Sequence, residues 1–140
     1  MWKRKRRRLL RLKEFGRGMS NLPPYQRGDV VLTNSPLITD FGQAKLRPAV
    51  IVQNDIGNQF SLNLIVLAVS SQIPRKNYPT SHIIRYGTPA AQAAGLDRDS
   101  VVMAQMVVTI PKTAVTRLIG HLDAATMTAV DACLRVSLNL

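Results

Sequence analysis

The chain has 140 residues, 46% of them hydrophobic, a formal net charge of +11 and a single cysteine. One domain with a substantial core fits this length and composition, and the lone Cys133 excludes an internal disulfide or a cysteine-based metal site. No run approaches the ~20 apolar residues of a membrane span, and no signal-peptide core follows the first charges. We therefore expect a cytoplasmic protein without a membrane partner.

The positive charge is concentrated at the start of the chain. Residues 1–18 hold nine Lys and Arg against one acid, Glu14, whereas residues 19–140 hold ten cations and seven acids. Three interpretations fit this segment: an arm that binds phosphates nonspecifically, a basic amphipathic segment at a membrane surface, or an extension (1–20) that is disordered and precedes a domain at 21–140. The sequence from Met19 also looks like an ordinary protein start.

The first half of the chain predicts three strands. Residues 26–33 combine a Gly-Asp turn with β-favouring side chains, and residues 48–53 and 62–69 are continuous apolar runs typical of buried strands. A 13-residue loop (34–46) separates the first two strands, and loops of this length often carry function. Residues 54–58, a cluster of Asn, Asp and Gly, predict a turn.

The second half predicts three more strands, at residues 81–85, 100–110 and 115–122. The strand at 100–110 is long, and we expect it to bend near residues 104–105. A polar loop (73–80) precedes these strands.

Two helical segments complete the pattern. Thr88 and Gly95 bound a short helical turn, and Asp123 caps a final helix at 124–138. Apolar side chains recur along this helix in three- and four-residue steps; they are Met127, Val130, Leu134 and Leu138. We therefore expect a mainly β fold with some α structure: a small, strongly curved sheet or partly closed barrel with a C-terminal amphipathic helix packed against it.

Several kinds of chemistry are excluded by missing motifs. The sequence has no phosphate-binding loop, nucleophile elbow or HExxH metal motif, so we expect no metal or cofactor. His82 and His121 lie in strand-like runs, and we interpret them as structural or surface residues. Asp97 and Asp99 fall in a turn and do not form the carboxylate cluster of a two-metal nuclease.

Arg47 and Ser70 are the remaining candidates. Arg47 begins the second strand and Ser70 ends the third, so antiparallel pairing of these strands brings both side chains to one pocket. A guanidinium stabilises charge on a phosphate, a hydroxyl positions a phosphate oxygen, and RNA supplies its own nucleophile, the 2′-OH. The pair fits phosphodiester cleavage without a metal. The alternative is that Arg47 simply begins a strand in solvent.

Five stretches resemble the MazF/PemK family of toxin endoribonucleases. They are RGDVVL at 27–32, KLRPAVIVQNDIGN at 45–58, LAVSSQI at 67–73, RDSVVMAQMVVTIPK at 98–112 and IGHLDAATMTAVDACLRVSLNL at 119–140. The resemblance implies an SH3-like barrel that forms homodimers. It also implies metal-independent, sequence-selective cleavage of single-stranded RNA, including mRNA, to 2′,3′-cyclic phosphate and 5′-OH ends, with neutralisation by a small antitoxin.

The resemblance also assigns residues to roles. The family's catalytic arginine falls on Arg47 and its catalytic threonine on Ser70, where serine keeps the hydroxyl and lacks a methyl. Many relatives carry an acid, a glutamine and an arginine where this chain has Gln105, Met106 and Val108. Charges that hold RNA in those relatives are therefore absent here.

We expect RNA contacts from the loops and strand ends around this pair. Phe41 is available either to stack on a base or to anchor the loop in the core, and Gln105 to hydrogen-bond a base edge. The full set is Arg27, Phe41, Lys45, Ser71, Gln72, Arg75, Lys76 and Gln105.

Two other functions stay open at this level. The same fold also serves toxins that poison DNA gyrase through their C-terminal helix, although residues 138–140 match no such ending. The second is a non-catalytic RNA-binding relic, which stays open because the strand at 100–110 lacks charged residues.

Overall fold

The protein folds around one curled antiparallel sheet. The computed structural model describes residues 25–38 and 45–140, so Phe41 and the basic segment 1–18 lie outside the described residues. The sheet order is β4-β5-β3-β2-β1-β6. The strands are β1 (Asp29–Thr33), β2 (Arg47–Ile51), β3 (Asn63–Ser70), β4 (Ser81–Ile84), β5 (Ser100–Pro111) and β6 (Val115–His121). All six overlap the predicted strands, and their ends lie within two residues of the predicted ones, except that β1 begins three residues later than expected.

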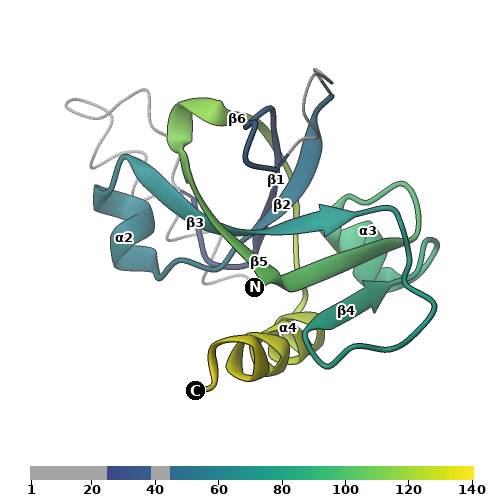
Figure 1. Ribbon diagram of the computed structural model, residues 1–140. Coiled ribbons are helices and arrows are strands. Elements are labelled where there is room, and N and C mark those ends of the chain that lie inside the picture. Colours follow the sequence, from purple (N-terminus) through teal and green to yellow (C-terminus); the bar gives the residue numbers. More distant parts are fainter. Residues whose placement is uncertain (1–24, 39–44) are drawn as a thin grey trace.

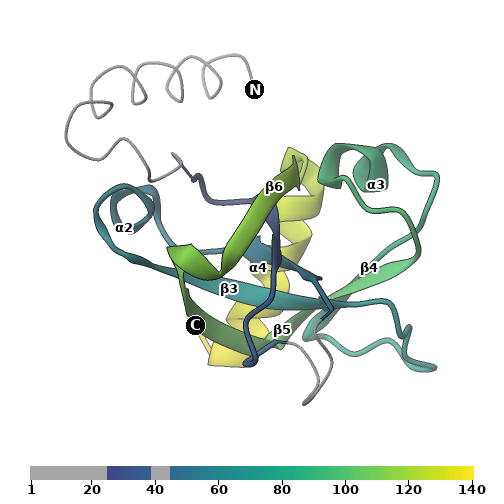
Figure 2. The same ribbon diagram turned by 90° about the horizontal axis from the view of Figure 1, so that it is seen from above.

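The predicted mainly β fold with a curved sheet is confirmed. The strands curl strongly, and α4 (Ala124–Leu138) packs below β4 and β5 (Figure 1). Both views place α3 (Pro89–Ala94) and β4 at one end of the molecule and α2 (Asp55–Phe60) at the other (Figure 2). Among the described residues β4 and β6 are the two edges of the sheet, so hydrogen bonds do not close it into a full barrel.

The predicted bend in β5 is present and produces much of the curvature. Ala68 of β3 pairs with Met103, while the preceding residue, Leu67, pairs with Val107. One step along β3 therefore corresponds to four steps along β5. Extra residues in one strand of an antiparallel pair bend that strand and increase its twist.

Two hydrophobic clusters occupy the two faces of the sheet. Side chains alternate across a strand, so Val50 joins the cluster under α3 and α4, while Ala49 and Ile51 join the cluster inside the curl. The cluster inside the curl consists of Tyr25, Val31, Ala49, Ile51, Leu64, Val66 and Ile110. The curl is therefore filled by side chains rather than open.

The two predicted helix caps form as expected. Thr88 Oγ1 accepts a hydrogen bond from the Ala91 amide at 3.2 Å, and Asp123 Oδ1 accepts one from the Thr126 amide at 2.8 Å. In α4, Val130 and Leu134 are buried, while Leu138, the last predicted core position, is 51% exposed. Within the described ranges, no helix has both the length and the apolar character needed to cross a membrane.

The predicted turn at 54–58 is wrong, because these residues begin helix α2. The Asn54 side chain accepts a hydrogen bond from the Gly57 amide at 2.8 Å and caps the helix. Gly57 lies within the helix, at a position where a Cβ would come within 2.9 Å of the Gln53 side chain. Glycine thus permits a close contact here, whereas the sequence pattern suggested that it marked a turn.

Candidate functional site

Arg47 and Ser70 lie at the same level of two neighbouring strands. Strand β2 pairs with β3 through Ala49↔Ala68 and Val50↔Leu67. Two further steps of this register place residue 47 opposite residue 70. By alternation both side chains project toward the inside of the curl, the side of Ala49 and Ala68. The structure therefore brings together the two residues that the sequence predicts as catalytic.

Two surface hollows meet at this pair. Arg47, Val69, Ser70 and Ser71 line both of them. The smaller hollow, of about 290 Å³, lies on the inner side and is completed by Ile38, Ala68, Gln72, Met103 and Met106. The larger, of about 660 Å³, lies on the α3 side and is completed by Leu32, Lys45, Leu46, Pro48, Gly95, Leu96, Asp97, Arg98, Ser100, Arg117 and Ile119. An extended ligand can run from one hollow to the other past Arg47 and Ser70.

The Ser70 hydroxyl has a defined local contact. Its Oγ accepts a hydrogen bond from the Gln72 amide at 3.1 Å. Because a hydroxyl both accepts and donates, this bond leaves the O–H hydrogen able to donate to a ligand. The side chain is half-buried at the end of β3, so its hydroxyl is held by the turn and still reaches the hollow.

The predicted RNA contacts divide into two groups. Lys45, Ser71 and Gln72 line the hollows beside Arg47. Arg75 and Lys76 are exposed in the loop after β3 and line neither hollow.

Gln105 lies in the bend of β5. It is exposed, and its Oε1 accepts a hydrogen bond from the Ser81 hydroxyl at 3.4 Å. Its neighbour Met106, 40% exposed, lines the smaller hollow with Arg47 and Ser70. An apolar side chain thus contributes to the wall of the site.

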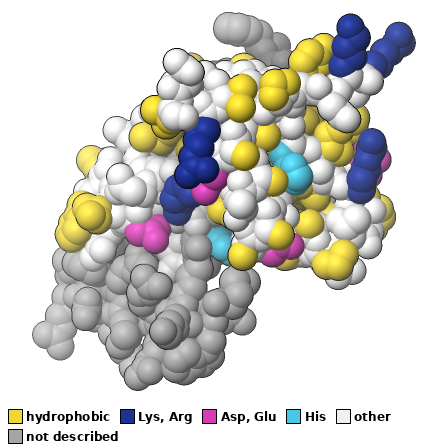
Figure 3. Space-filling model, turned by 90° about the horizontal axis from the view of Figure 1, so that it is seen from below, with side chains coloured by type: hydrophobic (Ala, Val, Ile, Leu, Met, Phe, Trp, Pro, Cys, Tyr) yellow, Lys and Arg dark blue, Asp and Glu magenta, His cyan; other side chains and the backbone are white. Residues whose placement is uncertain are grey.

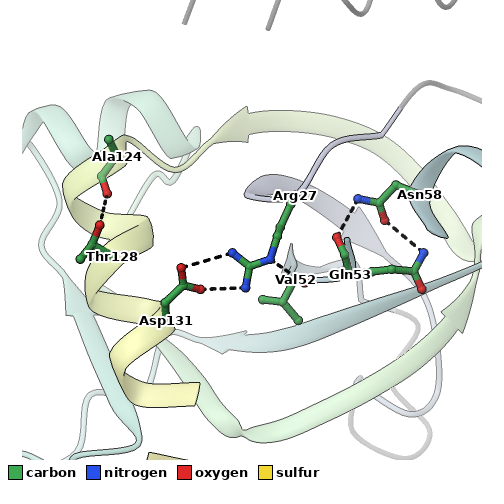
Figure 4. A network of polar contacts seen from close by, with 7 residues as sticks. All are labelled: Arg27, Val52, Gln53, Asn58, Ala124, Thr128 and Asp131. Carbon is green, nitrogen blue, oxygen red and sulfur yellow. Dashed lines mark hydrogen bonds and ion pairs between the residues drawn. The ribbon is translucent and has the colours of Figure 1, made fainter. Parts of the chain in front are cut away.

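Arg27 lies at the other end of the β1–β2 pair from Arg47, and its side chain binds protein groups (Figure 4). Its Nη2 donates to Asp131 Oδ1 at 2.7 Å, its Nη1 to Asp131 Oδ2 at 3.3 Å, and its Nε to the Val52 carbonyl at 2.8 Å. The guanidinium thereby joins β2 to α4. The structure does not bring Arg27 together with the other predicted RNA contacts.

Arg98 and Arg117 were not predicted, yet both line the larger hollow. Arg117 comes from β6, which pairs with β1 at Leu32↔Arg117, so only knowledge of this pairing reveals its position. On the α4 face, by contrast, the Lys and Arg side chains occur in separate small groups (Figure 3).

The histidines have structural surroundings. His121 Nδ1 lies 2.9 Å from Oδ1 of Asp29, a carboxylate that is 1% exposed. Burial lowers the pKa of His82, and the nearby Asp123 carboxylate partly opposes that shift. No group of three or more His, Cys, Asp or Glu in the described part of the chain is arranged to hold a metal ion.

Comparison with known proteins assigns the chain to a family. Residues 26–138 match the family described as PemK-like, MazF-like toxin of type II toxin-antitoxin system. The chain belongs to this family. The predicted MazF/PemK membership is therefore confirmed, and the match leaves the basic segment 1–18 outside.

Relatives of this MazF/PemK toxin include endoribonuclease EndoA of Bacillus subtilis, which is 38% identical over 115 residues, covering 82% of this chain and 95% of the relative. A solved endoribonuclease from a mycobacterial species superposes with a TM-score of 0.65 at 20% identity, covering 86% of this chain and 96% of that chain. A MazE–MazF complex from Deinococcus radiodurans gives a TM-score of 0.63 at 17% identity, and the match covers 83% of this chain and 96% of that chain. The structural matches support the fold, and the names agree with the predicted class of enzyme.

Proposed function

We propose that this toxin is a metal-independent, sequence-selective endoribonuclease for single-stranded RNA. The observation that carries the proposal is that Arg47 and Ser70, at adjoining ends of the paired strands β2 and β3, line both hollows where these meet. A guanidinium and a hydroxyl at adjoining strand ends suit a phosphodiester. The planar cation holds two phosphate oxygens, and the hydroxyl donates a hydrogen bond to another oxygen of the same group. RNA then supplies the nucleophile itself.

The reaction transfers the phosphorus between two oxygens of the RNA. The 2′-oxygen forms a bond to phosphorus and its proton is released, while the bond to the 5′-oxygen breaks and that oxygen gains a proton. The products are a 2′,3′-cyclic phosphate and a 5′-OH end. Arg47 stabilises the negative charge that builds on the phosphate oxygens, and Ser70 fixes the phosphate for in-line attack.

The smaller hollow provides a place for a base next to the scissile phosphate. Ile38, Met103 and Met106 give it apolar walls, and Gln72 adds an amide that donates and accepts hydrogen bonds. Methionine side chains contact aromatic rings favourably and adapt their shape to them. We infer that selectivity arises here, with Gln105 on the same bend of β5 and Phe41 in the loop as further base contacts.

Family membership supports proposals about the remaining partners. One solved relative is described as an endoribonuclease in complex with its cognate antitoxin, and we propose that a small antitoxin likewise neutralises this toxin. We also propose a homodimer acting on RNA, including mRNA, in the cytoplasm. A hollow between β3, β5 and α4 supports association through that surface: Ile65, Val107, Leu134, Leu138 and Leu140 give it apolar walls, beside the charged Arg27, Asp131 and Arg135.

Mapping the ends of cut RNA tests the proposal directly. The full chain is incubated with a long single-stranded RNA in EDTA, and both ends of each fragment are determined. We expect cuts at a defined short sequence with cyclic phosphate and 5′-OH ends. Intact RNA, or cleavage that EDTA abolishes, contradicts the proposal.

A further inference from the structure

The larger hollow beside Arg47 has an unusual balance of charge. Among the described residues, four cations line it, against a single acid. The cations are Lys45, Arg47, Arg98 and Arg117, and the acid is Asp97. Only Arg47 is needed at the scissile phosphate, so three cations of this hollow have no place in the reaction described above.

These cations reach the hollow from three separate elements. Arg117 lies on β6 opposite Leu32 of β1, and Leu32 lies opposite Pro48 of β2. Arg117 is therefore two strands away from Pro48, the neighbour of Arg47, on a common row across the sheet. Lys45 precedes β2, and Arg98 lies in the turn between α3 and β5. The sheet register, rather than a flexible loop, sets the position of Arg117.

The acids of the described residues neutralise little of this charge. The side chains of Lys45 and Arg117 make no hydrogen bond or ion pair with another described residue, and both are exposed at the hollow. Asp97 Oδ1 contacts Nε of Arg98 at 3.0 Å, which leaves the terminal nitrogens of that guanidinium outside the pair. The contact with Arg98 lowers the pKa of the Asp97 carboxyl. Cations gathered in a concave surface raise the local potential and favour an anion.

We propose that Arg117 and Lys45, together with Arg98, form a second phosphate subsite that holds the RNA phosphate next to the scissile one. This inference rests on the proposed function. Arg47 and Ser70 line both hollows, so a strand that places a base in the smaller hollow and its phosphate at this pair continues into the larger one. The next phosphate along the backbone then meets the cations there.

The continuity of the two hollows favours RNA over an acidic peptide as the occupant. Phosphates recur along the RNA backbone, so fixing one at Arg47 brings its neighbour to the adjoining hollow without a further binding event. A guanidinium fork also matches phosphate oxygens in a bidentate geometry. The subsite reads no base, and its contribution is to hold the strand in register across Arg47.

Neutralising one phosphate at a time tests the subsite. The probe is a 2′-O-methyl RNA carrying the mapped cleavage sequence, which keeps its charges and lacks the attacking hydroxyl. A series of such RNAs replaces each phosphate in turn by an uncharged methylphosphonate. Affinities are measured for the wild type, for Arg117→Ala and for the control Arg85→Ala. Arg85 is an exposed cation that lines neither hollow, and its Nη1 lies 3.1 Å from Oδ2 of Asp99.

We expect Arg117→Ala to weaken binding of the fully charged RNA about tenfold and to lower the slope of log affinity against log salt by about 0.7. The wild type and Arg117→Ala should have equal affinity for the RNA that carries a methylphosphonate next to the scissile phosphate. Arg85→Ala changes neither quantity. These results support the subsite.

Other results overturn it. Equal losses from Arg117→Ala at every methylphosphonate position mean that Arg117 acts through general charge only. Unchanged RNA binding combined with weaker binding of an acidic peptide assigns the hollow to a protein partner. The wild type is assayed in parallel on unmodified RNA in EDTA. Cleavage there with no effect of Arg117→Ala rejects the subsite alone, whereas absence of both cleavage and binding rejects the proposed function as well.

Discussion

Arg47 of β2 and Ser70 of β3 line the same two hollows, at positions that an extension of the antiparallel register by two residues beyond Ala49 and Ala68 sets opposite one another. The relative position of the two side chains is thus set by the sheet itself. A shift of the register by one residue would turn one of them to the other face. Groups positioned in this way need little reorganisation when a phosphate binds, which is what electrostatic stabilisation requires.

Replacing Arg47 tests the role of the guanidinium. We expect Arg47→Ala to lower the single-turnover rate of RNA cleavage in EDTA by about 10²–10³-fold, the usual loss when one group that stabilises transition-state charge is removed. Arg47→Lys keeps the charge but loses the planar fork, so we expect a rate between those of the wild type and Arg47→Ala. Equal thermal stability of the variants serves as the control. Wild-type cleavage by Arg47→Ala would remove this residue from the mechanism.

Replacing Ser70 tests the hydroxyl. Ser70→Ala loses the group that donates to the phosphate, and we expect cleavage to slow about tenfold or more, as loss of a hydrogen bond to a charged group does. Ser70→Thr restores the hydroxyl and restricts its rotation, so we expect activity at least equal to the wild type. The Gln72 amide also loses its acceptor in Ser70→Ala, and Ser70→Thr shows whether this turn or the hydroxyl itself matters. Equal rates for the alanine and threonine variants would contradict the role.

The strands, the helix caps and the Arg47–Ser70 pair could be predicted because each depends on local sequence or on the pairing of consecutive strands. The position of Arg117 at the site could not be predicted, because it depends on β6 pairing with β1, which lies more than 80 residues earlier in the chain. Met106 reaches the site only because extra residues bend β5. Helix α2 was missed because Gly57 resembles a turn signal, while the contact that requires glycine comes from Gln53.

Arg27 illustrates the same difficulty for charged residues. Arg27 is among the predicted RNA contacts, and in the structure its guanidinium binds Asp131 of α4 at 2.7 Å, with both side chains about one-third exposed. We expect Arg27→Ala to lower the free energy of unfolding by about 2 kcal/mol, and a double-mutant cycle with Asp131→Ala to show a coupling of at least about 0.5 kcal/mol. Denaturant unfolding measures both.

Two comparisons complete this test of Arg27. Arg135→Ala removes an exposed cation on α4, and we expect its effect to stay within about 0.5 kcal/mol. The predicted RNA contact of Arg27 is assessed separately from the salt dependence of RNA binding. A slope that falls in Arg27→Ala supports that contact, and an additive cycle contradicts the structural link to Asp131.

Asp123 gives the structure a defined dependence on acid. Its hydrogen bonds to Thr126 at the start of α4 lower the pKa of the carboxyl below its usual 3.8. The carboxylate's stabilising contribution is therefore complete above about pH 3.8, and it is lost as the pH falls through the lower pKa of the folded state. At pH 7 we expect Asp123→Ala to destabilise the protein by about 1 kcal/mol through loss of the cap, and Asp123→Asn to cost much less because asparagine also caps helices well. Unfolding in urea across the acid range measures these differences. As the carboxyl protonates, the wild type should lose its advantage over Asp123→Asn, and an advantage that persisted unchanged at the lowest pH would assign the effect to something other than this carboxylate.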